Sequence, residues 1–160
     1  MSVIGISCDN DKVTYVVITG SVGSPKILES ETYALNHIEK GKLLDSAVHR
    51  IANIIEKYSP EKAAVLIVDK VFKSTKTHPP KHQLEGVIIH KFYKAGINCM
   101  EYNRQKLLSI LKEKLKITEE VKPSEVKKKI IDKIYGSSDF KKAVSNDSQR
   151  EAFAIALTQL

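Results

Sequence analysis

The chain has 160 residues, enough for one domain with a hydrophobic core of its own. Hydrophobic residues make up 42% and charged residues 28% of the sequence, as in ordinary soluble globular proteins. No apolar run approaches the roughly 18 to 20 residues that a membrane-spanning helix needs, and the first residues lack the pattern of a secretory signal. We therefore expect one domain, residues 1–160, located in the cytoplasm and without a membrane partner.

The charge balance favours a polyanionic partner, since the net charge is +7 and the pI is near 9.3. Only three of the 26 basic residues are arginines, Arg50, Arg104 and Arg150. Lysine suits loose contact with phosphate, whereas bidentate reading of bases is typical of arginine. If the chain binds nucleic acid, its composition favours recognition of backbone and shape over base reading.

Three strands are predicted at the start of the chain, over residues 3–8, 12–19 and 26–35, joined by short turns. The third is the most polar, so we expect it near a sheet edge. Apolar residues at helical spacing then predict a helix from residue 43 to Tyr58, which ends at Ser59-Pro60. Cys8 and Cys99 have no metal-ligand spacing and are expected to be small apolar residues in strands rather than disulfide partners.

The central feature of the sequence is the run Ala63 to Phe72, whose unbroken apolar part ends at Asp69. Such a run is typical of a strand covered on both faces of its sheet. Open α/β sheets place their chemistry at the carboxyl ends of strands, which makes Asp69 a candidate site residue. The following loop is basic and contains no acid: Lys70, Lys73, Lys76, His78, Lys81 and His82. The alternative is a polar strand end followed by a solvated loop.

The rest of the chain alternates helices and one strand. We predict a helix after Pro79-Pro80 that ends at Gly96, a strand over residues 97–102, and a helix capped by Asn103. A further helix is expected from Pro123 to Gly136, with inward residues Val126, Ile130, Ile131 and Ile134. Residues 137–146 are expected to form a loop and residues 147–160 the last helix. This order predicts an α/β fold with a mixed five-stranded sheet, three antiparallel strands followed by βα units, and helices on both faces.

The order of elements is that of the ribonuclease H-like fold, and within it several segments resemble the RuvC-type Holliday junction resolvases. The segments are Val3–Ile6, Asp69–Phe72, Glu101–Gln105, Ser124–Val126 and Glu151–Ala156. The chain is also similar to small bacterial proteins of the same fold, which share the helix opening Leu84-Glu85. The resemblance implies phosphodiester cleavage with two Mg²⁺ or Mn²⁺ ions held by clustered carboxylates. It also allows a homodimer, for which the sequence itself indicates no interface.

The chain departs from the family pattern at the acids themselves. Ser7 stands where the family has its first Asp, Asp69 replaces a Glu, and Ser148 stands three residues before Glu151 where a second acid is expected. A neutral hydroxyl cannot supply the charge that a divalent cation requires. By strand alternation Asp9 lies on the same face as Ser7, but roughly 6 to 7 Å farther along the strand direction. Asp9 can take the place of the missing first acid only if the hairpin curls back.

Each candidate site residue has a structural alternative. The catalytic candidates are Asp69 and Glu151, the metal-ligand candidates are Asp69, Glu151, Asp9 and Asp147, and the candidate nucleic-acid contacts are Lys70, Phe72, Lys73, Lys76, Lys81, Lys127 and Lys128. Glu151 and Glu85 also suit helix dipoles as acids near helix starts, and Asp147 suits an N-cap. Phe72 can pack under its loop instead of stacking on a base, and the lysines can form a solvated face. His78 and His82 do not predict a zinc site, because Pro79-Pro80 separates them.

Three functional hypotheses follow. The first is a RuvC-like protein with a degenerate catalytic centre that binds branched or single-stranded nucleic acid, DNA rather than RNA, mainly through phosphates. The second is an active endonuclease dependent on Mg²⁺ or Mn²⁺ that uses Asp69, Glu151 and either Asp9 or Asp147. The third is a non-catalytic protein-interaction module that keeps only the fold.

Overall fold

The computed structural model describes residues 1–9, 11–35, 39–67 and 79–160 and contains one five-stranded sheet. The strands are β1 (Ser2–Cys8), β2 (Lys12–Ser21), β3 (Ser24–Ala34), β4 (Lys62–Leu66) and β5 (Asn98–Tyr102). Their order is β3-β2-β1-β4-β5, with antiparallel pairing among β1, β2 and β3 and parallel pairing among β1, β4 and β5. The mixed sheet is therefore confirmed, with β1 at its centre and β3 at an edge.

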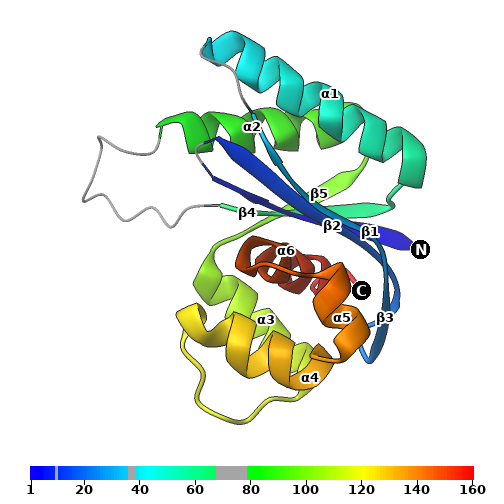
Figure 1. Cartoon of the computed structure of the whole chain (residues 1–160), viewed down its shortest axis with the longest axis vertical. Helices are drawn as coiled ribbons and strands as arrows, with labels where there is room; N and C mark the ends of the chain where they lie inside the picture. Colours follow the sequence, from blue (N-terminus) through cyan, green and yellow to red (C-terminus); the bar gives the residue numbers. More distant parts are fainter. Residues whose placement is uncertain (10, 36–38, 68–78) are drawn as a thin grey trace.

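Helices cover both faces of the sheet, as expected. The helical segments are α1 (Lys40–Tyr58), α2 (Pro79–Lys94), α3 (Arg104–Leu115), a 3-10 turn (Pro123–Glu125), a π-helical segment (Val126–Asp132), α4 (Lys133–Tyr135), α5 (Ser138–Ala143) and α6 (Asp147–Leu157). Figure 1 shows α1 and α2 on one face and α3 to α6 on the other. None of the helices described in the structure is long and apolar enough to cross a membrane.

Strand alternation divides the core into two halves. On β1, Ile4 and Ile6 belong to the core beneath α1 and α2, whereas Val3 belongs to the core beneath α6. Gly5 and Ser7 have the same parity as Val3, so they face the α6 layer. Both cysteines are free, and Cys8 is buried on the α1 and α2 side.

Three details of the sequence prediction are wrong. Residues 137–146 are not only loop: α5 forms within them, because the Ser137 side chain caps it and Phe140 is buried against Phe153. Ile134 was expected inward but is 45% exposed. Asn146, not Asp147, caps α6: its side chain accepts from the Gln149 backbone N–H. Strand β4 ends at Leu66, whereas the strand predicted from Ala63 was expected to end at Asp69; residues 68–78 lie outside the described residues.

Helix α6 lies directly on β1, and Gly5 makes this possible. A Cβ atom at Gly5 would stand 2.1 Å from the Ala152 carbonyl oxygen and 2.4 Å from the Ala156 nitrogen. Both neighbours are backbone atoms of α6 that cannot rotate away. The absence of a side chain at Gly5 therefore sets the distance between the central strand and the helix.

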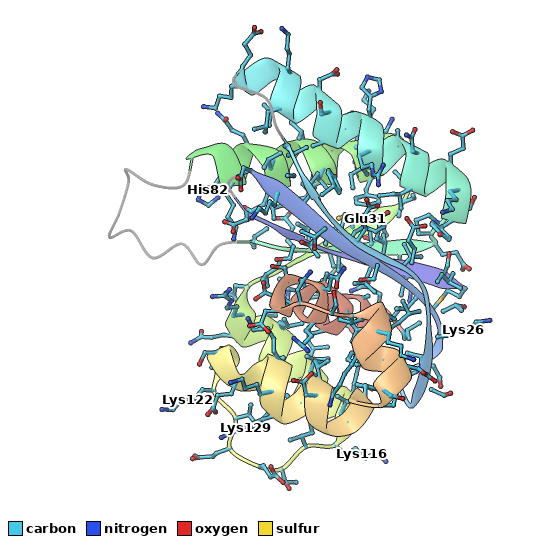
Figure 2. All side chains as sticks on the ribbon, viewed as in Figure 1. Lys26, Glu31, His82, Lys116, Lys122 and Lys129 are labelled. Atoms are coloured by element: carbon cyan, nitrogen blue, oxygen red, sulfur yellow. The ribbon has the colours of Figure 1, made fainter. Side chains whose placement is uncertain are left out.

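A polar network fastens the edge strand β3 to α1. Glu29 of β3 accepts hydrogen bonds from Tyr15, Lys57 and Tyr58, and Glu31 pairs with Arg50 of α1. Figure 2 shows Glu31 on the α1 side of the sheet. Burial alone would raise the pKa of Glu29, but the donors Lys57, Tyr15 and Tyr58 outweigh it and lower the pKa from 4.5 to about 2.

The contact at Gly5 can be tested with Gly5→Ala. The added methyl group must push α6 away from β1, so we expect the free energy of unfolding to fall by about 3 kcal/mol or more. Gly86→Ala is the matched control, because Gly86 lies in α2 with nothing within 4 Å of the new Cβ. Since alanine favours helix, this control should gain about 0.5–1 kcal/mol in urea unfolding. Equal effects of the two changes would contradict the close packing.

The Glu29 network predicts a pH-dependent stability. The pKa of Glu29 is lower in the folded state than in the unfolded state. The ionised carboxylate therefore adds its full contribution to the free energy of unfolding above pH 4.5, and this contribution disappears as the pH falls towards about 2. Glu29→Gln should cost about 1–3 kcal/mol at pH 7 because some donors lose their acceptor. The difference from wild type should shrink at pH 3 in urea unfolding. Glu56→Gln, at an exposed position on α1, should have little effect at either pH, and a Glu29 effect that stays constant between them would argue against the network.

Candidate functional site

A serine and a glutamate meet where β1 ends and α6 begins. Ser7, 6% exposed, donates a hydrogen bond from Oγ to Oε2 of Glu151 at 2.9 Å. Glu151 lies in the first turns of α6, whose start is fixed by a capping box between Asn146 and Gln149. The structure thus brings together two positions 144 residues apart in sequence.

The second oxygen of Glu151 is held by Arg104. Oε1 lies 3.1 Å from Arg104 Nε and 3.0 Å from Nη2. Arg104 is the first residue of α3, directly after β5 and the N-cap Asn103. Because β5 and β1 both run parallel to β4, the ends of all three strands reach the same edge of the sheet. The Glu151 side chain is only 15% exposed and the Arg104 side chain 55% exposed.

These residues line a pocket of about 210 Å³ at that edge. Two carboxylates, Asp9 and Glu151, share it with four cationic side chains. The cations are Lys12, Lys81, Arg104 and Lys127. Among the described residues of the pocket, cations therefore outnumber carboxylates two to one, and Glu151 is already paired with Arg104. The pocket is suited to an anion.

A smaller hollow of about 100 Å³ adjoins this basic pocket. The two share Arg104, Lys127 and Glu151, and the smaller one also has apolar walls from Leu107 and Val126. Arg104 therefore lies between a polar and a partly apolar cavity.

The acids named from the sequence have different surroundings. Glu151 and Asp9 line the same pocket. Asp147 lies outside its lining and instead contacts Lys127 at 3.2 Å and Arg150 at 3.1 Å. The hydrogen bond from Lys127 holds the pKa of Asp147 below its usual value. Asp69 lies outside the described residues, although Leu66, three positions earlier, pairs with Ser7 across the parallel strands.

The predicted nucleic-acid contacts also divide. Lys81 and Lys127 line the basic pocket, whereas Lys128 is exposed and outside its lining. The other candidates lie outside the described residues: Lys70, Phe72, Lys73 and Lys76. Figure 2 shows Lys122 and Lys129 on the helical layer that is separated from the sheet by α6. Lys129 forms an ion pair with Glu125 at 3.0 Å.

Sequence reasoning missed two cations of the pocket, Arg104 and Lys12. Asp69 was chosen because open α/β sheets place their chemistry at the carboxyl ends of strands. The same rule applied to the end of β5 would have found Arg104. Lys12 opens β2, and its neighbour Val13 pairs with Cys8 across the hairpin, which returns it to the end of β1.

Glu85 was expected to be a helix-dipole partner near the start of α2, but the first turn of α2 contains no acid. Glu85 is 3% exposed, and its carboxylate lies 3.2 Å from His82 Nδ1. His78, the other histidine considered for zinc, lies outside the described residues. Among described residues, no three or more His, Cys, Asp or Glu side chains form a group that could hold a metal ion.

The described residues of the pocket do not fit the two-metal centre that the resemblance implies. Both oxygens of Glu151 are engaged, one by the Ser7 hydroxyl and one by the Arg104 guanidinium. A divalent cation at Glu151 would have to displace Arg104 or lie close to its positive charge. Mg²⁺ and Mn²⁺ favour carboxylate oxygens free of such competition.

Comparison with known proteins finds similar structures but no similar sequences. No family model matches the chain, and no curated protein matches it. RuvC of Thermus thermophilus has a TM-score of 0.76 at 18% identity over 99% of this chain and 92% of its own. RuvC of T. thermophilus in complex with Holliday junction substrate has a TM-score of 0.74 at 19% identity, covering 99% of this chain and 91% of its own. The yeast mitochondrial Holliday junction resolvase has a TM-score of 0.61 at 14% identity, covering 98% of this chain and 76% of its own. The chain therefore has the ribonuclease H-like fold of the RuvC-type resolvases, which confirms the fold and the structural resemblance expected from the sequence.

The role of Ser7 can be tested by restoring an acid in Ser7→Asp, with Ser7→Asn as the neutral control of similar size. In EDTA the Asp variant should be less stable than the Asn variant by about 1 kcal/mol, or about 2–4 °C in unfolding temperature, because two carboxylates then face each other. Millimolar Mn²⁺ should raise the unfolding temperature of the Asp variant and leave wild type unchanged. An equal rise for wild type would show that its centre already binds the metal.

Proposed function

We propose that this chain is a nucleic-acid-binding protein of RuvC-like fold with a degenerate catalytic centre. It contacts the phosphates of branched or single-stranded DNA at the edge of the sheet where β1, β4 and β5 end. Its resemblance to the resolvases lies in the fold, not in a complete set of acids.

The observation that carries the proposal is the charge of the basic pocket. Lys12, Lys81, Arg104 and Lys127 surround Glu151, whose charge Arg104 already balances. Lys12 and Lys81 add two further positive charges to the lining of the pocket. Phosphate contact by such side chains is independent of base sequence and sensitive to salt.

The comparison with RuvC supports a DNA ligand over other polyanions. The complex of T. thermophilus RuvC with its Holliday junction substrate has the same fold over 99% of this chain. The net charge of +7 is in keeping with a large polyanion. A homodimer would suit a substrate with two-fold symmetry, and it stays a prediction.

An active endonuclease is the second candidate, and one observation favours it. Asp9, two residues beyond the position of the missing acid, lines the same pocket as Glu151. Together with Asp69 these carboxylates would form a metal centre if Arg104 moved away from Glu151. Cleavage of a labelled four-way junction in Mn²⁺ that is abolished by Glu151→Gln would favour this candidate.

Binding to a fluorescent four-way junction at increasing salt tests the proposal. We expect the logarithm of the affinity to fall linearly with the logarithm of the salt concentration, and Lys81→Ala and Lys12→Ala each to reduce the slope by about 1. Lys114→Ala is the matched control, since it removes an exposed lysine of α3 outside the pocket and should leave the slope almost unchanged. Linear duplex of the same length separates branched from general DNA binding.

Two results would contradict the proposal. A slope that no pocket lysine alters would place the phosphates elsewhere on the protein. Absence of binding to junction and single-stranded DNA even at 50 mM salt would leave the protein-interaction module as the remaining hypothesis.

A further inference from the structure

We propose that Arg104 takes the place of a divalent cation in this centre, so that the basic pocket binds a DNA phosphate without metal. This inference rests on the proposed function and adds to it which residue holds the phosphate and on what condition. Glu151 is then a positioning residue for Arg104 and not a metal ligand.

Arg104 is held in place by Glu151. A guanidinium has five N–H donors in a rigid plane. The Nε and Nη2 edge of Arg104 faces Glu151 Oε1 at 3.1 and 3.0 Å, which leaves the donors of Nη1 for another acceptor. Because the glutamate is 15% exposed and the arginine 55% exposed, the arginine is anchored on its buried side and accessible on the other.

Glu151 is itself fixed by a second contact. Its other oxygen, Oε2, accepts from Ser7 Oγ at 2.9 Å, and Ser7 belongs to the central strand. The carboxylate therefore cannot turn away from Arg104 without losing a hydrogen bond at a largely buried position. An aspartate at Ser7 would repel Glu151, whereas the hydroxyl orients it.

Most of the charged side chains around the accessible side of Arg104 are cationic. Lys12, Lys81 and Lys127 line the same pocket together with Asp9, and Lys127 also contacts Asp147 at 3.2 Å. A phosphodiester would meet one planar guanidinium and up to three ammonium groups. A divalent cation would meet the same positive charges, and they would repel it. The pocket thus offers the positive charge that a metal supplies in a carboxylate-rich centre.

The test measures junction affinity by fluorescence anisotropy at constant ionic strength, in 5 mM EDTA and in 5 mM MgCl₂. We expect wild type to bind equally well in both. Arg104→Ala should weaken binding on the order of 10-fold in both, because a charge-assisted hydrogen bond to phosphate is lost. Arg104→Lys should retain part of the affinity. Lys114→Ala, which removes one charge from the same helix outside the pocket, should change it less than 2-fold.

Glu151→Gln separates the two roles of the glutamate. If Glu151 positions Arg104, the amide oxygen of the glutamine in the variant still accepts a hydrogen bond from the guanidinium, and one negative charge is removed. Binding in EDTA should then stay equal or tighten by about 3-fold. If Glu151 holds a metal that binds the phosphate, the same change should weaken binding in MgCl₂. Thermal unfolding of each variant, without DNA, shows whether a loss of affinity reflects a loss of fold.

The outcomes distinguish this inference from the proposed function beneath it. Binding that appears only with MgCl₂, or a folded Arg104→Ala variant that binds as wild type does, would overturn the role of Arg104 and leave DNA binding standing. Failure of wild type to bind under both conditions would overturn both.

Discussion

The contact between Gly5 and the backbone of α6 is the constraint on which the site depends. A Cβ atom at Gly5 would overlap the Ala152 carbonyl, so strand and helix lie at backbone distance. Ser7 is two residues from Gly5 on the same face of β1, and Glu151 is next to Ala152 on α6. The hydrogen bond between Ser7 and Glu151 is therefore set by packing in the core and not by the flexibility of either side chain. The same packing buries the helix between the sheet and the π-helical segment beyond it.

Parallel strands then bring a cation to this carboxylate. Because β5 runs parallel to β4, and β4 parallel to β1, the chain leaves β5 on the same side as Ser7. The residue after the N-cap of the next helix is Arg104, and its guanidinium reaches Glu151. Glu151, a helix acid beside the strand ends where topology alone would suggest a metal ligand, is here one half of an ion pair. Topology determines where the site lies, and the side chains determine what it can bind.

The sequence was sufficient for the fold because the signals were long and agreed with one another. The apolar runs 3–8 and 12–19, separated by the turn signal Asp9-Asn10-Asp11, indicated the hairpin, and the apolar run from Ala63 indicated a strand covered on both faces. The α5 segment was missed because its capping serine and one buried Phe140 are weak signals in a polar stretch. The site was harder: Glu151, Asp9, Lys81 and Lys127 were named as candidates, but Arg104 was not, because its role as the partner of Glu151 depends on a contact between distant parts of the chain. No local pattern connects positions 104 and 151; the sheet order has to be known first.

In the function proposed here, charge balance links an incomplete set of acids to Arg104. A cluster of three or four carboxylates repels itself and needs the charge of two divalent ions to be stable. In the described part of this pocket Ser7 is neutral, and Glu151 needs one positive charge, which a guanidinium supplies with hydrogen-bond geometry that a hydrated metal does not reproduce. With Arg104 in the place of a metal ion, the surrounding lysines have no bound metal to repel. They instead strengthen the attraction for an anion. A serine at the first acid position and an arginine at the start of α3 are then two parts of one electrostatic arrangement: the serine removes the charge that would require metal, and the arginine balances the charge that remains.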